Sequence, residues 1–329
     1  MDTQDRPDPL ATARALGPAI AAAADAIERT RRIPAPLVSQ LHASRLFRLW
    51  LPRSVGGEQT DPGTCLLAIE EIARHDASVA WNAFVANSSS LIAAFLELDV
   101  ARTIFADART IVAWGPPNAT RASVVAGGYR LTGRWDFASG CRHANWMGAH
   151  GHVVETDGSL RLNRFGRPVI RSFLFPVEEA TLLDTWNTIG LRGTASDSYR
   201  LEDVFIPEAF SATREEPEQR RERGPLYAFP MQGLYAVGAA GVASGIARAM
   251  LDEFIALACR KSPRGLARLA DSAVVQADVA RAEARLASAR AYLLDTLASI
   301  YARADDIDAI GVPDARAAEF VDLDPAFAH

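Results

Sequence analysis

The 329-residue chain has few cysteines, no excess of positive charge and no cationic leader, and each absence removes a class of protein. Its three cysteines, Cys65, Cys141 and Cys259, are odd in number and lack metal-ligand spacing, which favours a reducing cytoplasm over a disulfide-bonded secreted protein. The 40 acidic and 35 basic residues give no electrostatic basis for binding nucleic acid or an anionic membrane surface. The N-terminus lacks the basic and apolar regions of a signal peptide, and the apolar runs are interrupted before they reach bilayer-spanning length. We therefore expect a cytoplasmic protein that binds neither nucleic acid nor membrane.

Two nucleotide-binding motifs and a metal-ligand pattern are also missing. No Gly-x-Gly-x-x-Gly segment follows a predicted strand, and no Gly-Lys-Ser or Gly-Lys-Thr phosphate loop occurs, so doubly wound dinucleotide folds and P-loop folds are unsupported. The six histidines show no spacing typical of metal ligands, and we expect no metal. His150 and His152 are two residues apart, and we interpret them as residues of one strand.

The patterns that are present divide the chain into three parts and a tail. Apolar residues recur at helical spacing up to about residue 108, and Asp61-Pro62 is typical of an N-cap followed by proline at the first helical position. Short alternating segments with Gly, Asn and Asp turns follow, which predict an antiparallel sheet or barrel. Two long helices come next, with a stripe that includes Leu286, Leu293 and Leu297 on the second. The predicted domains are a helical domain at 1–110, a β-barrel domain at 111–212, a helical bundle at 225–304 and a solvated tail at 305–329.

The most informative segment runs from Tyr129 to Gly140 and places two aromatics before a small hydroxyl. An apolar wall beside a hydroxyl and free backbone N–H groups suits a flat, redox-active ring, which needs a donor where charge develops on reduction. On these twelve residues alone, a β-hairpin with core aromatics and a turn serine is the favoured alternative, because short motifs are weak indicators.

A set of ordered motifs reverses that preference. From about residue 18 to about residue 302 the chain resembles the acyl-CoA dehydrogenase superfamily, and more closely the branch that contains the oxygenase components of flavin-dependent monooxygenases. The motifs are Leu46-Phe-Arg-Leu-Trp-Leu-Pro52 with Gly56-Gly57, Glu70 to Asp76 with Ser78 to Trp81, Gly127 to Gly140, Asp184 to Asp197, and Asp203 to Pro207. The resemblance implies an α+β fold with an N-terminal helical domain, a central antiparallel β-barrel and an incomplete C-terminal helical bundle.

The resemblance also implies a flavin, FAD or FMN, between the barrel and the C-terminal helices. It gives Ser139 the catalytic position near flavin N5. Gly190 and Gly193 let backbone approach a planar ligand closely, and Thr194 and Ser196 can donate to ring carbonyls or phosphate. Arg260 occupies a position from which the family often reaches a flavin phosphate in a neighbouring subunit. The implied cofactor-binding residues are Trp135, Phe137, Ser139, Gly140, Trp186, Gly193, Thr194, Ser196 and Arg260, and the candidates for substrate contact are Trp114 and Asn118.

Three functions follow from the resemblance and stay open at this stage. The first is the oxygenase component of a two-component monooxygenase, which takes reduced flavin from a separate reductase, oxygenates a small aromatic or heteroatom substrate and forms a homo-oligomer, a dimer or tetramer. The second is an acyl-CoA dehydrogenase. The third is a truncated, non-catalytic paralogue, because the family pattern stops near Tyr301 and would leave the apolar stripe of the last helix exposed.

Overall fold

The computed structural model of the chain describes residues 7–214 and 216–310. The N-terminal part is helical, as the sequence predicts. Asp61 and Asp76 each accept a hydrogen bond of 2.9 Å from the N–H three residues further on, and these bonds cap two consecutive helices. The helices of this part are α1 (Pro9–Thr30), α2 (Ala35–Ala43), α3 (Pro62–Ala73), α4 (Ala77–Ser90) and α5 (Leu98–Phe105).

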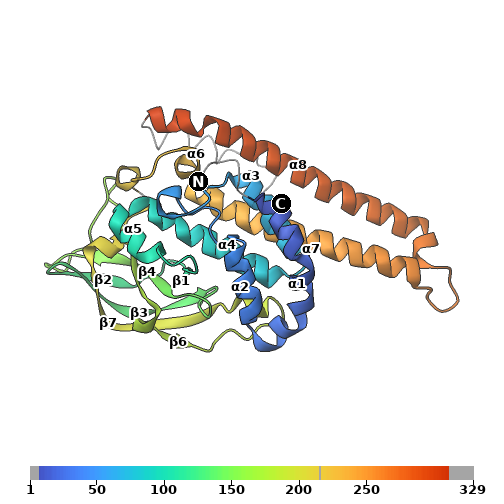
Figure 1. Cartoon of the computed structure of the whole chain (residues 1–329), viewed down its shortest axis with the longest axis horizontal. Helices are drawn as coiled ribbons and strands as arrows, with labels where there is room; N and C mark the ends of the chain where they lie inside the picture. Colours follow the sequence, from blue (N-terminus) through green and yellow to red (C-terminus); the bar gives the residue numbers. More distant parts are fainter. Residues whose placement is uncertain (1–6, 215, 311–329) are drawn as a thin grey trace.

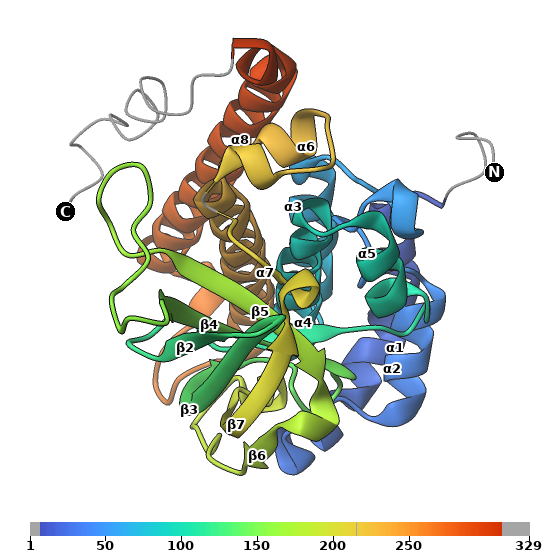
Figure 2. The same cartoon turned by 90° about the vertical axis from the view of Figure 1, so that its left-hand side faces the viewer.

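An eight-stranded sheet follows the helical part (Figure 2). The strand order is β6-β7-β3-β2-β4-β5-β8, with β1 beside β4. The predicted antiparallel pairing holds for β2–β3, β3–β7, β4–β5, β5–β8 and β6–β7, but β1–β4 and β2–β4 are parallel, so the sheet is mixed. The strands are β1 (Val112–Trp114), β2 (Arg121–Val125), β3 (Gly128–Ala138), β4 (Trp146–Val154), β5 (Ile170–Pro176), β6 (Thr181–Leu183), β7 (Asp197–Pro207) and β8 (Ser211–Ala212).

The end of β3 is irregular, and this irregularity shapes the molecule's main cavity. Tyr129, Leu131 and Trp135 alternate into the core of the sheet, which would also direct Phe137 inward. The pairing of β3 with β7 shifts register between Trp135 and Ala138, and Phe137 adopts a φ of 60°. This bulge reverses the alternation, so that Ala138 is buried and Phe137 is 61% exposed.

The C-terminal part is dominated by two long helices, α7 (Met231–Arg260) and α8 (Ala273–Ile310), preceded by the short α6 (Pro225–Ala228). The first half of α7 packs on α3 and α4 through glycines. A Cβ at Gly238 would lie 1.8 Å from Phe84 Cδ2, and one at Gly245 would lie 2.4 Å from Ala73 Cβ, so only glycine permits this close approach. The C-terminal half of α7 and the N-terminal half of α8 project away from the sheet as an antiparallel pair (Figure 1).

The structure differs from the sequence-based predictions in three features of the helices. The stripe on α8 is not exposed, because Leu297 is buried and Leu293 packs against the helical core. Residues 305–310 continue α8, and the remainder of the expected tail lies outside the described residues. Two helices, α1 and α7, are by length and composition apolar enough to cross a membrane, contrary to the sequence expectation. Both pack within the helical layers, against α3 in each case, so they serve here as helices of a globular core.

Candidate functional site

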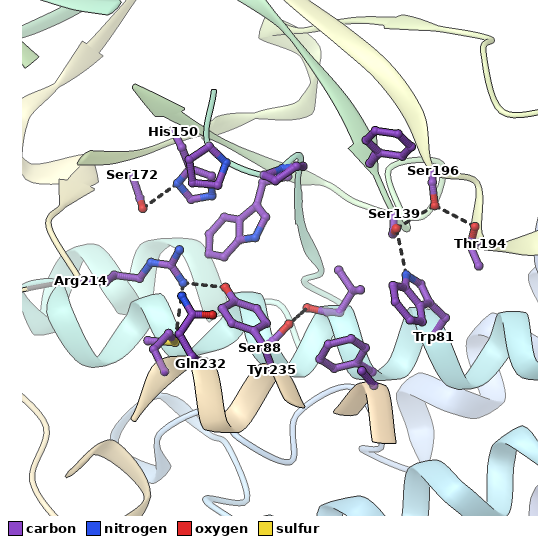
Figure 3. Close-up of a pocket in the computed structure, with 18 of the residues that line it drawn as sticks. Trp81, Ser88, Ser139, His150, Ser172, Thr194, Ser196, Arg214, Gln232 and Tyr235 are labelled. Carbon is purple, nitrogen blue, oxygen red and sulfur yellow. Dashed lines mark hydrogen bonds between the residues drawn. The ribbon is translucent and has the colours of Figure 1, made fainter. Parts of the chain in front are cut away.

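A cavity of about 890 Å³ lies between the sheet, α4 and the first turns of α7 (Figure 3). This volume is within the range of roughly 300–1,000 Å³ found for small-molecule and cofactor sites. Its wall combines aromatic and aliphatic side chains with two separate groups of polar side chains. The lining residues are Trp81, Phe84, Val85, Ser88, Trp114, Pro116, Pro117, Phe137, Ser139, His150, Ile170, Ser172, Trp186, Leu191, Thr194, Ser196, Arg214, Pro230, Met231, Gln232, Tyr235 and Ala239.

Phe137 and Trp186 form an aromatic wall at one end of the cavity. Their ring centroids are 6.1 Å apart and their planes are nearly perpendicular, at 80°. The positive φ of Phe137 is a genuine outlier for a bulky residue, and such strain costs about 1–3 kcal/mol. An exposed aromatic ring held in a strained backbone conformation at a cavity wall is typical of a ligand-binding surface.

A row of hydroxyl groups lies beside this wall. Ser139 Oγ is 2.7 Å from Ser196 Oγ, which is 2.7 Å from Thr194 Oγ1. Thr194 Oγ1 donates to the carbonyl oxygen of Leu191 at 2.9 Å, and the Trp81 indole N–H donates to Ser139 Oγ at 3.0 Å. Because Ser196 Oγ can donate either to Ser139 or to Thr194, Ser139 can present a proton or a lone pair to the cavity without moving a heavy atom. Figure 3 shows this row at one side of the cavity.

The turn that carries Thr194 and Ser196 is a second strained element. Leu191 and Ala195, with φ values of 52° and 48°, flank the 3₁₀ turn Arg192–Thr194. The turn is held against the helical domain, since a Cβ on Gly193 would lie 2.1 Å from Ile27 Cγ2. Gly193 therefore serves the packing of α1 on this turn and does not line the cavity, and its role in cofactor contact stays a prediction.

Two further predicted site residues also lie outside the cavity. Trp135 is fully buried in the sheet, stacks on Tyr199 at 5.3 Å and donates its indole N–H to the carbonyl oxygen of His150. It stays inward because the bulge turns only the residues after it. Asn118 is exposed, and its amide donates to the carbonyl oxygen of Arg134 while its oxygen accepts from Thr120 N–H, so it orders its own loop.

The other predictions are placed as follows. Trp114, Phe137, Ser139, Trp186, Thr194 and Ser196 come together in the cavity wall. The N–H of Gly140 donates to the carbonyl oxygen of Thr194 at 2.8 Å, so this residue joins β3 to the turn and has no N–H left for a ligand. Arg260 is the last residue of α7 and does not line the cavity, and its role toward a neighbouring subunit stays a prediction.

Sequence reasoning missed the second polar group, which lies at the other end of the cavity (Figure 3). Arg214 Nη1 donates to Tyr235 Oη at 2.9 Å, and the guanidinium lies 4.8 Å from the centre of the Trp114 ring. His150 is buried on β4, with Nδ1 2.9 Å from Ser172 Oγ on β5. Burial and, to a lesser degree, the charge of Arg214 hold the pKa of His150 well below its usual range, so this imidazole is neutral. The only sequence signal was the pair His150 and His152, which we had interpreted as strand residues.

The residues around Phe137 fit an isoalloxazine ring. The exposed phenyl and indole rings offer flat apolar contact, and the hydroxyl row offers hydrogen bonds to a heterocycle along its edge. Ser139, Thr194 and Ser196 are buried, so hydrogen bonds that they make into the cavity face little competition from water.

Two family models match the chain, the N-terminal domain of acyl-CoA dehydrogenases at residues 11–98 and the C-terminal domain at residues 237–322. The chain is 33% identical to indole-3-acetate monooxygenase of Pseudomonas putida over 87% of its own length and 74% of that protein. It is also 33% identical to the flavin-dependent monooxygenase oxygenase subunit HsaA of Rhodococcus jostii, over 66% of its length and 56% of HsaA. The solved structure of XiaF from Streptomyces sp. in complex with FADH2 superimposes with a TM-score of 0.81 at 26% identity, covering 92% of this chain and 76% of XiaF.

The order of elements, the cavity wall and the sequence matches agree with one another. A helical domain, a mixed sheet and a pair of long helices surround a cavity with a wall of aromatic rings and hydroxyl groups, and the relatives are named as oxygenases. The chain belongs to the acyl-CoA dehydrogenase superfamily, within the branch of oxygenase components of flavin-dependent monooxygenases.

Proposed function

We propose that this protein is the oxygenase component of a two-component flavin-dependent monooxygenase that hydroxylates a small aromatic substrate. When bound, reduced flavin supplies two electrons and the position at which O2 is activated. The overall balance converts a substrate C–H bond, O2 and reduced flavin into a C–OH group, water and oxidised flavin. The observation that carries the proposal is the hydroxyl row from Ser139 to Thr194 beside the exposed ring of Phe137.

The residues of this chain have three tasks in such a reaction. Phe137 and Trp186 hold the ring by flat and edge contact and exclude water from it. Ser139 donates at the ring edge where charge changes, and its position is fixed by the Trp81 indole N–H at 3.0 Å. Ser196 and Thr194 keep Ser139 supplied with a hydrogen-bond partner whichever direction its own proton takes.

The cavity lining favours an oxygenase over an acyl-CoA dehydrogenase. A dehydrogenase removes an α-proton from its substrate with a carboxylate base, and no Asp or Glu lines the cavity within the described residues. The polar groups at its far end are the guanidinium of Arg214, the amide of Gln232, the hydroxyls of Tyr235 and Ser172 and the neutral imidazole of His150. These groups suit binding of an aromatic substrate better than the formation of a carbanion. Relatives named for indole-3-acetate and for resorcinol hydroxylation support an aromatic substrate class.

The partners and assembly belong to the same proposal. Relatives named as an oxygenase subunit or an FADH2-dependent oxygenase component support a separate reductase that delivers FADH2 or FMNH2 in the cytoplasm. The distal half of α7 exposes Met250, Phe254 and Leu257, and this apolar face supports a homo-oligomer, in which a second copy would cover it. In that arrangement Arg260, on the same projecting helix, would be placed to reach a neighbouring subunit.

A stopped-flow experiment tests the function. The purified chain is mixed anaerobically with FADH2 or FMNH2 and then with O2 and an aromatic substrate, and flavin oxidation is followed by absorbance. We expect oxidation kinetics that differ from those of free flavin, and one ¹⁸O atom per product molecule when ¹⁸O2 is used. Oxidation at the free-flavin rate with only H2O2 as product would refute the proposal. Reduction of the oxidised flavin by an acyl-CoA would establish the dehydrogenase, and a folded protein that binds no flavin would establish a non-catalytic paralogue.

A further inference from the structure

The far end of the cavity contains a half-buried cation, Arg214, that pairs with no carboxylate of the described residues. Arg214 follows β8 and lines the cavity together with Tyr235 and Gln232 from the first turns of α7 (Figure 3). None of the described carboxylates lies within ion-pair distance of its guanidinium. Arg214 differs in this from the arginines of this chain that form ion pairs, most of which lie at the surface. Its Nε is buried and has no hydrogen-bond partner in the described part of the chain. A guanidinium in such a place is costly unless an anion compensates its charge.

The contacts that Arg214 does make orient it and leave donors free. Nη1 is engaged with Tyr235 Oη at 2.9 Å and lies 3.8 Å from Met231 Sδ, and the planar group lies over the Trp114 ring. Because Tyr235 Oη accepts from Arg214, its own proton is directed elsewhere, and no described residue accepts it. The Tyr235 hydroxyl and the part of the guanidinium that Tyr235 does not engage therefore constitute donors on one polar surface of the cavity.

Two other features make this end of the cavity favourable for negative charge. Pro230, Met231 and Gln232 line it at the start of the 30-residue helix α7, which has no side-chain cap, so the positive end of the helix dipole lies here. His150 cannot supply a charge that competes with Arg214, since it is neutral and pairs with Ser172. The side chains between the two polar ends are aromatic or aliphatic, including Phe84, Val85 and Trp114.

We propose that Arg214 and Tyr235 form an anion subsite that binds the carboxylate of an aromatic acid and thereby orients its ring toward the wall at Phe137 and Ser139. This proposal deepens the proposed function, on which it rests, by naming the substrate class: a small aromatic ring with a short carboxylate side chain. A planar carboxylate matches the forked donors of arginine, and Trp114 stacks under the guanidinium and keeps its plane fixed.

Ligand binding without flavin tests the subsite separately from the oxygenase activity. Isothermal titration calorimetry of the full chain compares indole-3-acetate with the neutral indole-3-acetamide, which has nearly the same shape. The wild-type protein should prefer the acid by about 10- to 100-fold, the effect expected for a charge-assisted hydrogen bond in a partly buried site. Arg214→Gln should abolish the preference and leave the affinity for the amide within about twofold. Arg200→Gln removes the same charge from an exposed pair with Glu202 and should leave the preference intact.

Equal binding of acid and amide by the wild type, or an unchanged preference in Arg214→Gln, would overturn the proposal.

A second titration identifies the source of the anion. If Arg214→Gln weakens FMN but not riboflavin, and the acid competes with FMN, Arg214 serves the flavin phosphate and the substrate assignment is wrong. Circular dichroism and thermal unfolding of each variant verify folding, and Arg214→Lys, which keeps the charge, should retain part of the preference. Acid preference in a protein that fails to bind reduced flavin would leave the subsite standing and refute the oxygenase.

Discussion

Replacing Ser139 with alanine should weaken flavin binding and should also destabilise the fold, by free energies of similar size. In the protein, Ser139 Oγ accepts from the Trp81 indole at 3.0 Å and pairs with Ser196 Oγ at 2.7 Å, and the residue is 7% exposed. The substitution removes both bonds, each with a net contribution of about 0.5–1.5 kcal/mol to stability. We therefore expect a loss of about 1–3 kcal/mol in the free energy of unfolding, reduced where water from the cavity reaches the Trp81 N–H.

The effect on the cofactor has a different origin. If Ser139 donates to the flavin edge, the variant leaves a buried acceptor unpaired in the complex, which costs about 1–3 kcal/mol. Since about 1.4 kcal/mol is a factor of ten, the dissociation constant of reduced flavin should rise by about 5- to 140-fold. The fraction of O2 released as H2O2 should rise as well, because the ring is held less firmly and water reaches it.

The assay is an anaerobic titration of the protein with FADH2 and FMNH2, followed by the quenching of tryptophan fluorescence from the cavity wall. Ser90→Ala is the matched control, because this buried serine of α4 donates at 2.7 Å to the Asn87 carbonyl oxygen and lies outside the cavity. It should lose about 0.5–1.5 kcal/mol of stability, the contribution of one hydrogen bond, with flavin affinity unchanged. Ser139→Thr, which keeps the hydroxyl, should retain most of the affinity. Unchanged flavin affinity and H2O2 release in Ser139→Ala would remove Ser139 from the site and refute this reasoning.

Three other predictions concern the structure that supports the site. Gly193→Ala should destabilise the protein by about 1–3 kcal/mol in urea unfolding, because its Cβ would lie 2.1 Å from Ile27 Cγ2; an unaffected midpoint would contradict the tight packing of the turn. Burial lowers the pKa of His143 from 6.5 to about 4, so the unfolded chain binds the proton more strongly than the folded protein does. The free energy of unfolding should therefore fall as pH drops from 6.5 toward 4, by up to about 1.4 kcal/mol per pH unit. His143→Gln should flatten this slope in pH-dependent unfolding, and an identical slope would exclude His143 as its cause. Arg290→Ala should lower the free energy of unfolding by about 1–3 kcal/mol and expose α8 to proteolysis, because Arg290 Nε lies 2.8 Å and 3.1 Å from the two carboxylate oxygens of buried Glu70. Protease resistance equal to that of the wild type would contradict the role of this ion pair in holding α8.

Local signals in the sequence were sufficient for much of the fold. The Asp61-Pro62 cap starts α3 where predicted, and the short strands expected within 111–212 are β1 to β8. These elements follow from contacts within a few residues, such as a side chain that accepts a neighbouring N–H, or from a period that a single strand must obey. The parallel pairing of β4 with β1 and β2 could not be predicted, because it depends on where the connecting segments bring the strands together.

The site, like the fold, contains features that the sequence predicted and features that it did not. The adjacency of Phe137, Ser139 and the Thr194–Ser196 turn was predicted through the resemblance, and the structure brings these residues together. Trp135 was misplaced because it shares strand parity with Phe137, and only the bulge in the pairing with β7 separates the two side chains.

The sequence by itself determined the helix–sheet–helix order, the family and the hydroxyl end of the cavity, because each is encoded in residues close together in the chain or in an ordered set of motifs. The tertiary structure alone decided that Arg214 faces Tyr235 and that His150 pairs with Ser172 in the same cavity. These contacts join β4, β5, the segment after β8 and α7, and no local sequence pattern specifies where the Arg214 guanidinium lies relative to distant strands and helices.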